Sequence, residues 1–511
     1  MNKRWFYKLF RRRMIISMLI LAQAAFLIWL VASGSTLSHT LNTILRMLSL
    51  LAVLYIVSKG GKGSFKTLWV FLILSFPIFG GLLYLFVNLQ SSTRKMRKTL
   101  DAARHSTKPL YALPEDGYRK AAAETGYYFP QVRYLQDTCG FPIYDRTQTK
   151  YYCPGEEFLL ALLDELEKAE HYIFLEYFLI QQGIMWDSIL EVLRRKAKKG
   201  VKVRILYDDL GCFFLLPADY PNQLSALGIE CGIFNPFHPL LTALQNNRDH
   251  RKIAVIDGKV AFTGGINLAD EYVNAYNKFG HWKDSAVKVE GKAAWSFTLM
   301  FLEMWRSCGK EAEDLSLYYP WRITPCSVES DGFVLPYCDS PMDEEHVSEQ
   351  VYLQILNQAQ EYVYINTPYL IIDDSMVEAL CLAAKRGVDI RIVTPHRWDK
   401  WAIHMTTRSY YRELLRGGVK IYEYSHGFIH AKSFVSDDQV ATVGTANLDY
   451  RSLFHHFECG AWMFKTTAVT ELKQDFLQTL QNCQEITMES TSKNPFMLLF
   501  QEVLRLIAPL L

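Results

Sequence analysis

The stretch His250-Arg-Lys-Ile-Ala-Val-Ile-Asp-Gly-Lys-Val-Ala-Phe-Thr-Gly-Gly-Ile-Asn267 decides the fold, because the chain contains its pattern twice. The second copy is His430-Ala-Lys-Ser-Phe-Val-Ser-Asp-Asp-Gln-Val-Ala-Thr-Val-Gly-Thr-Ala-Asn447. The residue types His, Lys, Asp, Gly and Asn recur in both copies at identical spacing. Such a match arises by chance at roughly one start site in 10⁷ at average residue usage. The two stretches therefore indicate an internal duplication.

The duplication extends upstream of the motif and predicts the domain organisation. Lys168–Leu179 is similar to Gln358–Tyr369, and Lys199–Leu206 is similar to Arg386–Val393. Each copy alternates short β-branched or aromatic runs with helical runs, which is typical of α/β architecture. The first copy carries about ten extra residues before its motif, around Pro236–Asn246. We expect two duplicated α/β domains, each a mixed sheet flanked by helices, about a pseudo-twofold axis. Their predicted bounds are 126–325 and 326–511, after a linker at 91–125.

Residues 1–90 form a predicted membrane region with three hydrophobic segments, at 14–32, 41–57 and 65–89. The first exceeds the roughly 7–15 residues of a signal-peptide core, which favours a membrane anchor over a cleaved leader. Pro77 and Gly80-Gly81 interrupt the third. We expect two crossings, a re-entrant or interfacial hairpin at 65–89, and catalytic domains in the cytoplasm, because basic residues flank these segments. Three crossings with outward-facing catalytic domains is the alternative.

The charge distribution separates the membrane region from the rest of the chain. The whole chain has 55 basic and 53 acidic residues, but residues 1–100 contain fourteen basic and no acidic ones. The remainder therefore has a net charge of −12, which argues against a nucleic-acid partner. The ten cysteines include no Cys-x-x-Cys, so they are expected to be reduced thiols rather than a disulfide frame or a zinc site.

The motif residues suit a phosphodiester substrate. Strand alternation places His250 and Lys252 on one face, and likewise His430 and Lys432. Two ammoniums and the amides of Asn267 and Asn447 can hold the phosphate oxygens. One neutral imidazole can attack phosphorus and form a phosphohistidine, while the other, protonated, serves the leaving alkoxide and then the incoming hydroxyl. No metal is required, and a lysine beside each histidine disfavours the alternative of a metal site.

Four acids accompany the motifs. Asp284 and Glu458 each open a strand-like run after a motif, and we expect Asp284 to orient His250 and Glu458 to orient His430. Solvated acids at strand ends are the alternative. Asp257 and Asp437 complete the motif pattern, but they lie beyond a strand and a turn, so we expect them to hold the motif loop.

Other candidates lie at strand ends and on aromatic helices. Ligands bind at strand ends in open α/β sheets, which favours Glu176 with Asn366, and Asp208-Asp209 with Thr394-Pro395. A third group would cover a lipid headgroup or pack inward from an amphipathic helix: Trp398, Trp401, Arg408, Tyr410 and Tyr411. His455-His456 are expected in a polar loop. The apolar stripe of Phe496–Ile507 fits packing on the second domain or lying on a membrane.

The paired motifs resemble those of the phospholipase D superfamily, and more narrowly of its bacterial cardiolipin synthases. The residues that carry this resemblance are Asn247–Gly258, Gly264–Leu268, His430–Lys432, Gly444–Ser452 and the membrane segment around Pro77–Tyr84. The resemblance implies that two phosphatidylglycerol molecules become cardiolipin and glycerol through a phosphatidyl-histidine, with no cofactor. His250 would be the nucleophile and His430 the acid and base. Gly265 and Thr445 stand where the superfamily often has serine, and Asp249 stands where asparagine is common.

The resemblance implies a catalytic set of His250, Lys252, Asp257, His430, Lys432 and Asp437. Phosphate-binding or supporting residues would be Asn267, Asn447, Gly265, Thr445, Asp284 and Glu458, and the partners would be phosphatidylglycerol and cardiolipin in the membrane. Three alternatives stay open at this point: a membrane-bound phospholipase D that hydrolyses headgroups, a nuclease on the same scaffold, and an inactive membrane scaffold. The acidic soluble part disfavours the nuclease, and the completeness of both motifs disfavours the scaffold.

Overall fold

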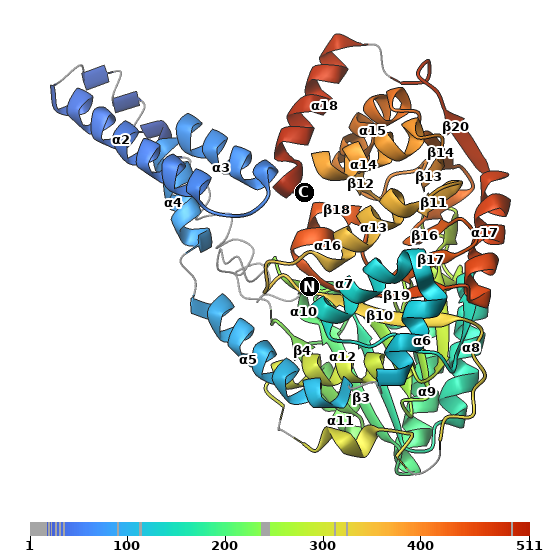
Figure 1. Ribbon diagram of the computed structural model, residues 1–511. Helices are drawn as coiled ribbons and strands as arrows, with labels where there is room; N and C mark the ends of the chain where they lie inside the picture. The colour runs from blue at the N-terminus through green and yellow to red at the C-terminus, as the bar shows by residue number, and fades with distance from the viewer. Residues whose placement is uncertain are drawn as a thin grey trace. The chain divides into compact units, whose positions relative to one another are not determined.

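The structure is a computed structural model that describes Met18, Leu21 and residues 23–25, 28–29, 32–33, 36–88, 91–111, 115–236, 246–310, 313–322, 325–491 and 494–510. The chain divides into two units, whose elements are labelled in Figure 1. The smaller unit contains the described residues up to Met96, residues 246–247 and those from Leu506 onward. The larger unit contains residues 97–236 and 248–505, and both motifs lie within it.

The smaller unit contains α2 (Thr36–Ser58), α3 (Gly63–Ser75) and α4 (Pro77–Asn88). Their apolar side chains pack together, with Ile73 and Tyr84 buried, and the ring centroids of Tyr84 and Trp69 lie 5.2 Å apart. The break between α3 and α4 falls at Pro77, because proline lacks the N–H that would continue the ladder of α3. The predicted segment 65–89 is thus two helices that pack on each other.

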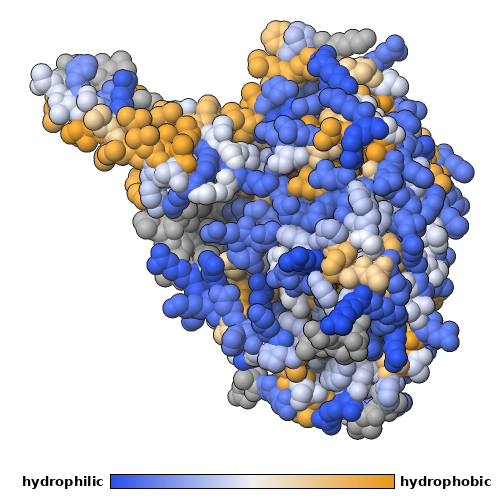
Figure 2. Space-filling view, in the orientation of Figure 1, coloured by the Kyte–Doolittle hydropathy of each residue, from blue (hydrophilic) through white to orange (hydrophobic). Residues whose placement is uncertain are grey.

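Among the described residues, one helical stretch is long and apolar enough to cross a membrane, at His39–Ser58 in α2. It contains the predicted second segment, 41–57. The predicted first segment, 14–32, lies outside the described residues apart from isolated positions. Figure 2 shows hydrophobic side chains gathered over α2 and α3. The number of crossings stays a prediction.

The predicted linker is helical wherever it is described, and its second part packs within the larger unit. Its elements are α5 (Ser91–Thr107), η1 (Lys108–Tyr111) and α6 (Glu115–Thr125), followed by η2 (Gly126–Tyr128) and α7 (Phe129–Cys139). The Thr107 hydroxyl donates to Glu303 at 2.5 Å, and Arg104 pairs with Asp343 at 3.0 Å. These contacts make the segment from Arg97 onward part of the folded unit.

The first half of the larger unit is a seven-stranded mixed sheet in the order β1-β9-β7-β6-β2-β3-β4. Its strands are β1 (Thr147–Tyr152), β2 (Tyr172–Tyr177), β3 (Lys202–Asp208), β4 (Glu230–Phe234), β6 (Lys252–Ile256), β7 (Val260–Gly264) and β9 (Ala286–Gly291). Its helices are α8 (Gly155–Lys168), α9 (Ile184–Lys198), α10 (Asp209–Cys212), α11 (Tyr220–Ala226), η4 (Asp270–Val273), α12 (Ala294–Ser307) and η5 (Leu315–Tyr318). Strands β2, β3 and β4 run parallel, and the others are antiparallel to their neighbours. Strand β2 lies inside the sheet and is buried along its whole length, including Glu176 in its otherwise apolar and aromatic sequence.

The second half repeats this order as β10-β19-β17-β16-β11-β13-β14, and β20 extends it. Its strands are β10 (Phe333–Asp339), β11 (Tyr362–Asn366), β13 (Asp389–Pro395), β14 (Lys420–Tyr424), β16 (Ser433–Ser436), β17 (Val440–Gly444), β19 (His456–Phe464) and β20 (Cys483–Ile486), with a separate pair β12 (Leu370–Ile371) and β18 (Leu448–Asp449). Its helices are α13 (Val347–Gln358), α14 (Asp374–Lys385), α15 (Trp401–Arg416), α16 (Tyr450–Phe454), α17 (Thr467–Leu480) and α18 (Pro495–Ile507). The last element, η6 (Ala508–Leu510), is assigned to the smaller unit. The predicted duplicated α/β fold is confirmed, and the exact domain bounds stay a prediction.

Short strands join the two halves. Strand β5 (Arg248–Asp249) pairs in parallel with the start of β19, and β8 (His281–Lys283) pairs in parallel with β15 (Gly427–Ile429). Each of these pairs takes one strand from each half. In each pair one strand directly precedes a His-x-Lys stretch: β5 precedes the first and β15 precedes the second. The junction of the halves therefore positions both motifs.

Candidate active site

His250 and His430 each lie between a junction strand and the first strand of their own motif hairpin. His250 follows β5, and its backbone N–H donates to the carbonyl of Phe457 at 2.9 Å. His430 follows β15, and its backbone N–H donates to the carbonyl of Lys283 at 2.7 Å. The two histidines are only 8% and 7% exposed. The backbone of the opposite half therefore fixes the position of each imidazole.

Each imidazole is bound by a carboxylate of the opposite half. The Nδ1 of His250 lies 2.9 Å from Oε1 and 3.1 Å from Oε2 of Glu458. The Nδ1 of His430 lies 2.7 Å from Oδ2 of Asp284. The predicted pairing of Asp284 with His250 and of Glu458 with His430 is therefore wrong, because the partners are exchanged.

The exchange follows from the register of the junction strands. Asp249 lies opposite Phe457, so the next residues along the two parallel strands, a histidine and a glutamate, become neighbours. Ile429 likewise lies opposite Lys283, which brings the next histidine beside an aspartate. Both acids are fully buried, as orienting groups for an imidazole need to be, and not solvated strand-end acids.

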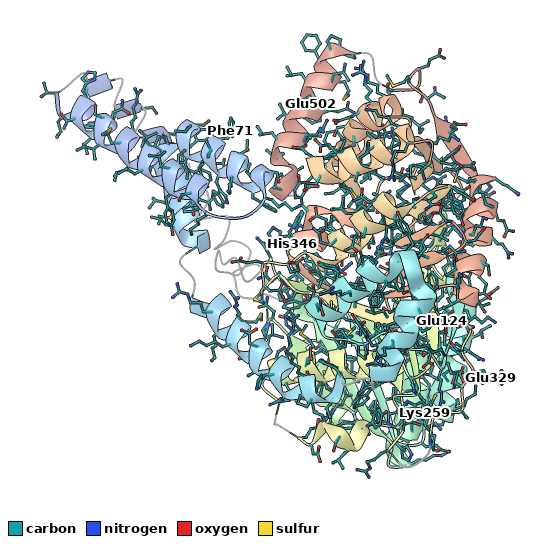
Figure 3. The ribbon with its side chains drawn as sticks, viewed as in Figure 1. Phe71, Glu124, Lys259, Glu329, His346 and Glu502 are labelled. Carbon is teal, nitrogen blue, oxygen red and sulfur yellow. The ribbon has the colours of Figure 1, made fainter. Side chains whose placement is uncertain are left out.

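Asp257 and Asp437 hold turns at the far ends of the motif strands. The Asp257 carboxylate accepts three hydrogen bonds of 2.7–2.8 Å from the backbone N–H groups of residues 170–172. Asp437 accepts three of 2.8–3.0 Å from residues 360–362. Both occupy left-handed backbone, at φ 52° and 54°, which aspartate tolerates better than most residues. Figure 3 labels Lys259 in the first of these turns. The two aspartates are structural residues, as their place beyond the strand predicts, and do not belong with the catalytic groups.

The two motif lysines share one electrostatic site. The Nζ of Lys252 donates to the carbonyl of His250 at 2.6 Å, and the Nζ of Lys432 lies 2.8 Å from Nδ1 of His430. Burial lowers the pKa of Lys252 to about 8 and the pKa of Lys432 to about 7, and the charge of Lys252 adds to the lowering at Lys432. Because the two ammoniums repel each other, a phosphate anion between them would favour the charged form of both.

The imidazoles are poised to be neutral until an anion enters. Burial lowers the pKa of His250 to about 3, against the opposing effect of Glu458. Burial, followed by the charge of Lys432, lowers the pKa of His430 well below its ordinary value. A bound phosphodiester would raise both pKa values, since a nearby negative charge favours the protonated form. With Nδ1 engaged by a carboxylate, Nε2 of His250 is the nitrogen left for attack.

The residue two positions before the motif asparagine differs between the halves, and the difference matches the carboxylate beside it. A Cβ on Gly265 would lie 2.0 Å from Oδ1 of Asp284, so a glycine is required there. In the second half the Thr445 hydroxyl donates to Oε2 of Glu458 and accepts from the backbone N–H of Cys459 at 3.0 Å. Glu458 therefore accepts a hydrogen bond from a threonine hydroxyl, whereas steric crowding at Gly265 leaves no room for a hydroxyl side chain beside Asp284.

The motif asparagines mainly support neighbouring loops. Asn267 donates to the Tyr272 hydroxyl at 2.7 Å and accepts from the backbone N–H of Leu179 at 3.3 Å. Asn447 donates to Asp449 at 3.0 Å, while its side-chain oxygen is buried with no hydrogen-bond partner among the described residues. In Asn447 an acceptor oxygen thus remains for a hydrogen-bond donor of a ligand.

Three of the predicted strand-end candidates contact residues in or next to the motif stretches. Asp208 binds the Arg248 guanidinium at 2.7 Å and the backbone N–H of Asp249 at 3.0 Å. Glu176 is fully buried with its carboxylate 3.8 Å from Arg251. In the second half, Asn366 donates to Ser433 at 3.2 Å.

The aromatic group divides into buried and exposed members. The hydroxyls of Tyr411 and Thr394 lie 2.7 Å apart, and Arg408 binds Glu423, so these side chains pack α15 onto the sheet. Tyr410 is buried as well. Trp398 and Trp401 are half exposed. None of this group contacts the motif histidines among the described residues.

His456 is a site residue that the sequence reasoning missed. Its ring lies 5.4 Å from the ring of His250, and its Nδ1 lies 3.7 Å from Oε1 of Glu458. One ring nitrogen of each histidine and one carboxylate oxygen of Glu458 all lie within 4.8 Å of one another. Although burial opposes it, the pKa of Glu458 lies well below its ordinary value, because His250 and His456 stabilise the carboxylate. Strand alternation was the available signal, since positions 456 and 458 share one face of β19.

We expect a bell-shaped pH dependence of kcat/KM, which reports ionisations of the free enzyme. Activity should fall as the pH rises through about 7 to 8, because Lys432 and then Lys252 lose the proton that binds phosphate. It should also fall as the pH drops through about 6, because burial raises the pKa of Asp284 to about 6 and the neutral carboxyl no longer orients His430. The measurement is the initial rate at limiting substrate across this range.

The variant Lys432→Arg gives the control for the alkaline limb. A guanidinium keeps its charge at any pH in this range, so the limb assigned to Lys432 should disappear and leave the later one of Lys252. A profile that is flat between pH 6 and 8 in the native enzyme would contradict the assignment.

Residues 162–297 and 352–480 both match the family model described as "Cardiolipin synthase, PLD-like domain". These two ranges contain the two motifs and most of the two sheets. Residues 47–87 match a second family model, described as "Phospholipase_D-nuclease N-terminal".

Relatives align over nearly the whole chain. An uncharacterized protein of Streptococcus mutans is 42% identical over 462 residues, which are 90% of this chain and 99% of the relative. A cardiolipin synthase of Alkalihalophilus pseudofirmus is 34% identical over 471 residues, which are 91% of this chain and 92% of the relative. The solved structure of Haemophilus influenzae phosphatidylserine synthase has a TM-score of 0.54 at 13% identity, over 71% of this chain and 95% of its own, and this likeness concerns the fold alone.

The family model and the cardiolipin synthase relatives, together with the paired His-x-Lys site, identify a phosphatidyltransferase of the phospholipase D superfamily. Within that superfamily the chain belongs to the cardiolipin synthase family. The resemblance predicted from the sequence is thereby confirmed. The N-terminal family match, together with the apolar helix α2, associates the protein with membranes.

Proposed function

We propose that the enzyme transfers a phosphatidyl group between two phosphatidylglycerol molecules and releases glycerol. The observation that carries this proposal is the crossed pair of carboxylate-bound imidazoles flanked by two buried lysines. The cardiolipin synthases among the relatives support phosphatidylglycerol as donor and acceptor.

In the first step Nε2 of His250 attacks phosphorus, and the bond from phosphorus to the glycerol oxygen breaks. His430 donates a proton to that oxygen, so glycerol leaves as a neutral alcohol. In the second step His430 takes a proton from a hydroxyl of the second phosphatidylglycerol. The resulting oxygen nucleophile attacks phosphorus, the phosphorus–nitrogen bond breaks, and cardiolipin forms while His250 is regenerated.

The two lysines stabilise the negative charge that collects on the phosphate oxygens in both steps. Each begins below full protonation at neutral pH, because burial lowers its pKa, and the phosphate restores its charge. Glu458 and Asp284 keep Nδ1 of each imidazole occupied, so that both chemical steps use the Nε2 side.

The test of this function uses the purified full chain in vesicles that contain phosphatidylglycerol as the sole phospholipid. Cardiolipin and free glycerol should accumulate one for one, because every transfer releases one glycerol. No nucleotide-activated lipid should be needed. Phosphatidic acid as the sole product would favour a hydrolase, and dependence on a cytidine-activated donor would exclude this mechanism.

We propose further that the catalytic unit faces the cytoplasm and that the protein crosses the membrane twice. Arg94, Lys95, Arg97 and Lys98 follow the third hydrophobic segment, and such clusters favour the cytoplasmic side. A segment broken at Pro77 into two helices that pack on each other supports a hairpin that enters and returns.

A His105→Cys variant in a background without native cysteines should resist an impermeant thiol reagent on intact cells. It should react once the cells are permeabilised, and labelling of intact cells would contradict the proposal.

A further inference from the structure

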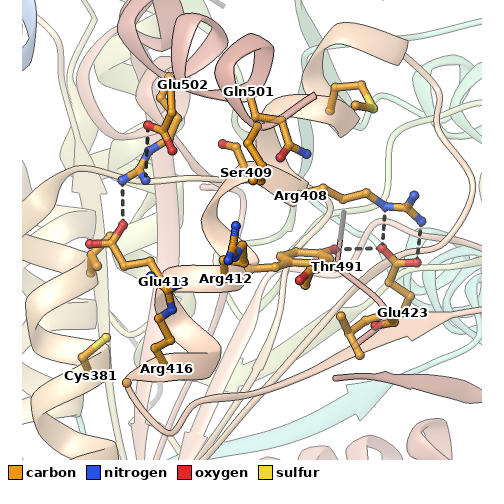
Figure 4. Close-up of a pocket in the computed structure, with 18 of the residues that line it drawn as sticks. Cys381, Arg408, Ser409, Arg412, Glu413, Arg416, Glu423, Thr491, Gln501 and Glu502 are labelled. Carbon is orange, nitrogen blue, oxygen red and sulfur yellow. Dashed lines mark hydrogen bonds and ion pairs between the residues drawn. The ribbon is translucent and has the colours of Figure 1, made fainter. Parts of the chain in front are cut away.

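A cavity of about 950 Å³ lies in the second half, apart from the motif residues. It is bounded by α14, α15, β14, β20 and α18, and Figure 4 shows the side chains that line it. None of its lining residues belongs to either His-x-Lys stretch. The cavity has no role in the transfer steps described above.

The cavity wall carries an arginine row. Arg408, Arg412 and Arg416 are spaced by four residues on α15, so they lie on one face of the helix. Arg408 binds Glu423 through two hydrogen bonds of 2.9 and 2.7 Å. Figure 4 shows Arg412 between Glu423 on one side and Glu413 on the other, and Glu413 is engaged by Arg505 at 2.8 Å.

The rest of the row lacks an acidic partner. Across the part of the chain that the structure describes, neither Arg412 nor Arg416 forms an ion pair, and the same holds for Lys385 on α14. The Nε of Arg412 is buried with no hydrogen-bond partner there. Glu378 is the lining carboxylate that is also unpaired, so the unpaired lining charges sum to positive. Arg416 is exposed, so the buried donor without a partner is that of Arg412, and it favours an anionic ligand in this positively charged cavity. Phosphate fits the fork of arginine donors.

The helix that closes the cavity is amphipathic in a way that suits a lipid. Met497, Leu498 and Gln501 of α18 line the cavity, while Phe496 and Leu499 are 82% and 64% exposed. Figure 2 shows hydrophobic side chains along α18, and Figure 3 labels Glu502 on the same helix. The ring of Phe500 lies 5.9 Å from that of the half-exposed Trp401. An exposed apolar face beside a cationic cavity is complementary to an anionic phospholipid. The lipid headgroup would lie inside the cavity and the acyl chains would lie along the helix.

We propose that this cavity is an accessory site for the phosphate of an anionic phospholipid, bound by Arg412 and Arg416. It is distinct from the transfer site at the histidines. The choice of a lipid over a soluble phosphate rests on the proposed function, and the exposed face of α18 is its independent support.

The test uses the full chain with His250→Ala, so that bound lipid is not consumed. It is reconstituted in nanodiscs with phosphatidylglycerol that carries a photoreactive group near the glycerol backbone. Irradiation should label peptides from Trp401–Arg416 and Pro495–Arg505. Adding Arg412→Gln and Arg416→Gln should lower this labelling about tenfold, because two charge-assisted contacts to phosphate are lost.

Matched variants and competitors complete the design. Arg194→Gln with Arg195→Gln on α9 removes the same charge at an exposed place and should leave the labelling unchanged. Arg412→Lys with Arg416→Lys keeps the charge without the fork and should give intermediate labelling, and this variant decides the matter if the glutamine pair unfolds. Short-chain phosphatidylglycerol in excess should compete.

Labelling that both substitution pairs at positions 412 and 416 leave unchanged would overturn the site. Equal competition by water-soluble glycerol 1-phosphate would overturn the assignment to a lipid. Because the labelled chain performs no transfer, either result leaves the vesicle assay for the proposed function independent of this one.

Discussion

Replacement of His250 by alanine should lower cardiolipin formation by at least about 10³-fold, and His430→Ala should have an effect of the same order, because groups that act as a unit fail together. Loss of His250 removes the nitrogen that carries the phosphatidyl group. Loss of His430 removes the proton for the leaving glycerol. The measurement is the initial rate of cardiolipin formation in phosphatidylglycerol vesicles.

A labelled intermediate should separate the two variants. With a p-nitrophenyl ester of phosphatidic acid as donor, the leaving group needs no proton. The His430→Ala enzyme should then still release one nitrophenolate per active site and hold the phosphatidyl group, stable to an alkaline detergent quench. The His250→Ala enzyme should release none. His171→Ala, at an exposed histidine, is the matched control and should keep the native rate. A burst in His250→Ala and none in His430→Ala would reverse the assigned roles.

The carboxylate substitutions should reveal the exchanged partners. Glu458→Gln should behave as a weaker form of His250→Ala, and Asp284→Asn as a weaker form of His430→Ala, because each acid binds the imidazole of the opposite half. An amide in place of the carboxylate favours the wrong imidazole tautomer and no longer stabilises an imidazolium. We expect turnover to fall about 10²- to 10⁴-fold in each case.

The activated donor again distinguishes the two substitutions. Glu458→Gln should slow the nitrophenolate burst itself, whereas Asp284→Asn should leave the burst fast and slow the turnover that follows. The reverse assignment would indicate pairing within each half, as the sequence order alone favours. Glu191→Gln, at an exposed acid on α9, is the control and should change neither phase.

The repeated motif was enough to predict the fold, because the same strands and helices surround both copies. The exchange of carboxylates could not be predicted in this way. It depends on the two- and three-residue junction strands β5 and β8, which are too short to show any periodicity. An internal repeat shows which residues of the two copies are equivalent, but it does not show which residues of one copy contact the other copy.

Other differences between the predictions and the structure also have identifiable causes. The predicted linker is part of the folded unit, because Arg104 and Thr107 have hydrogen-bond partners that are more than a hundred residues away in the sequence. His456 was assigned to a polar loop from its neighbour His455, although it opens β19 and faces Glu458. The helix break at Pro77 was visible in the sequence, because proline acts on its own backbone.

Because the carboxylates are exchanged, catalysis requires that the two halves stay in contact at their junction. If β5 parts from β19 and β8 from β15, both imidazoles lose their acids at once. Neither half can then retain a working histidine, however well its own sheet is folded. A chain cut between the halves should therefore be inactive as separate pieces and regain activity only when the pieces reassociate.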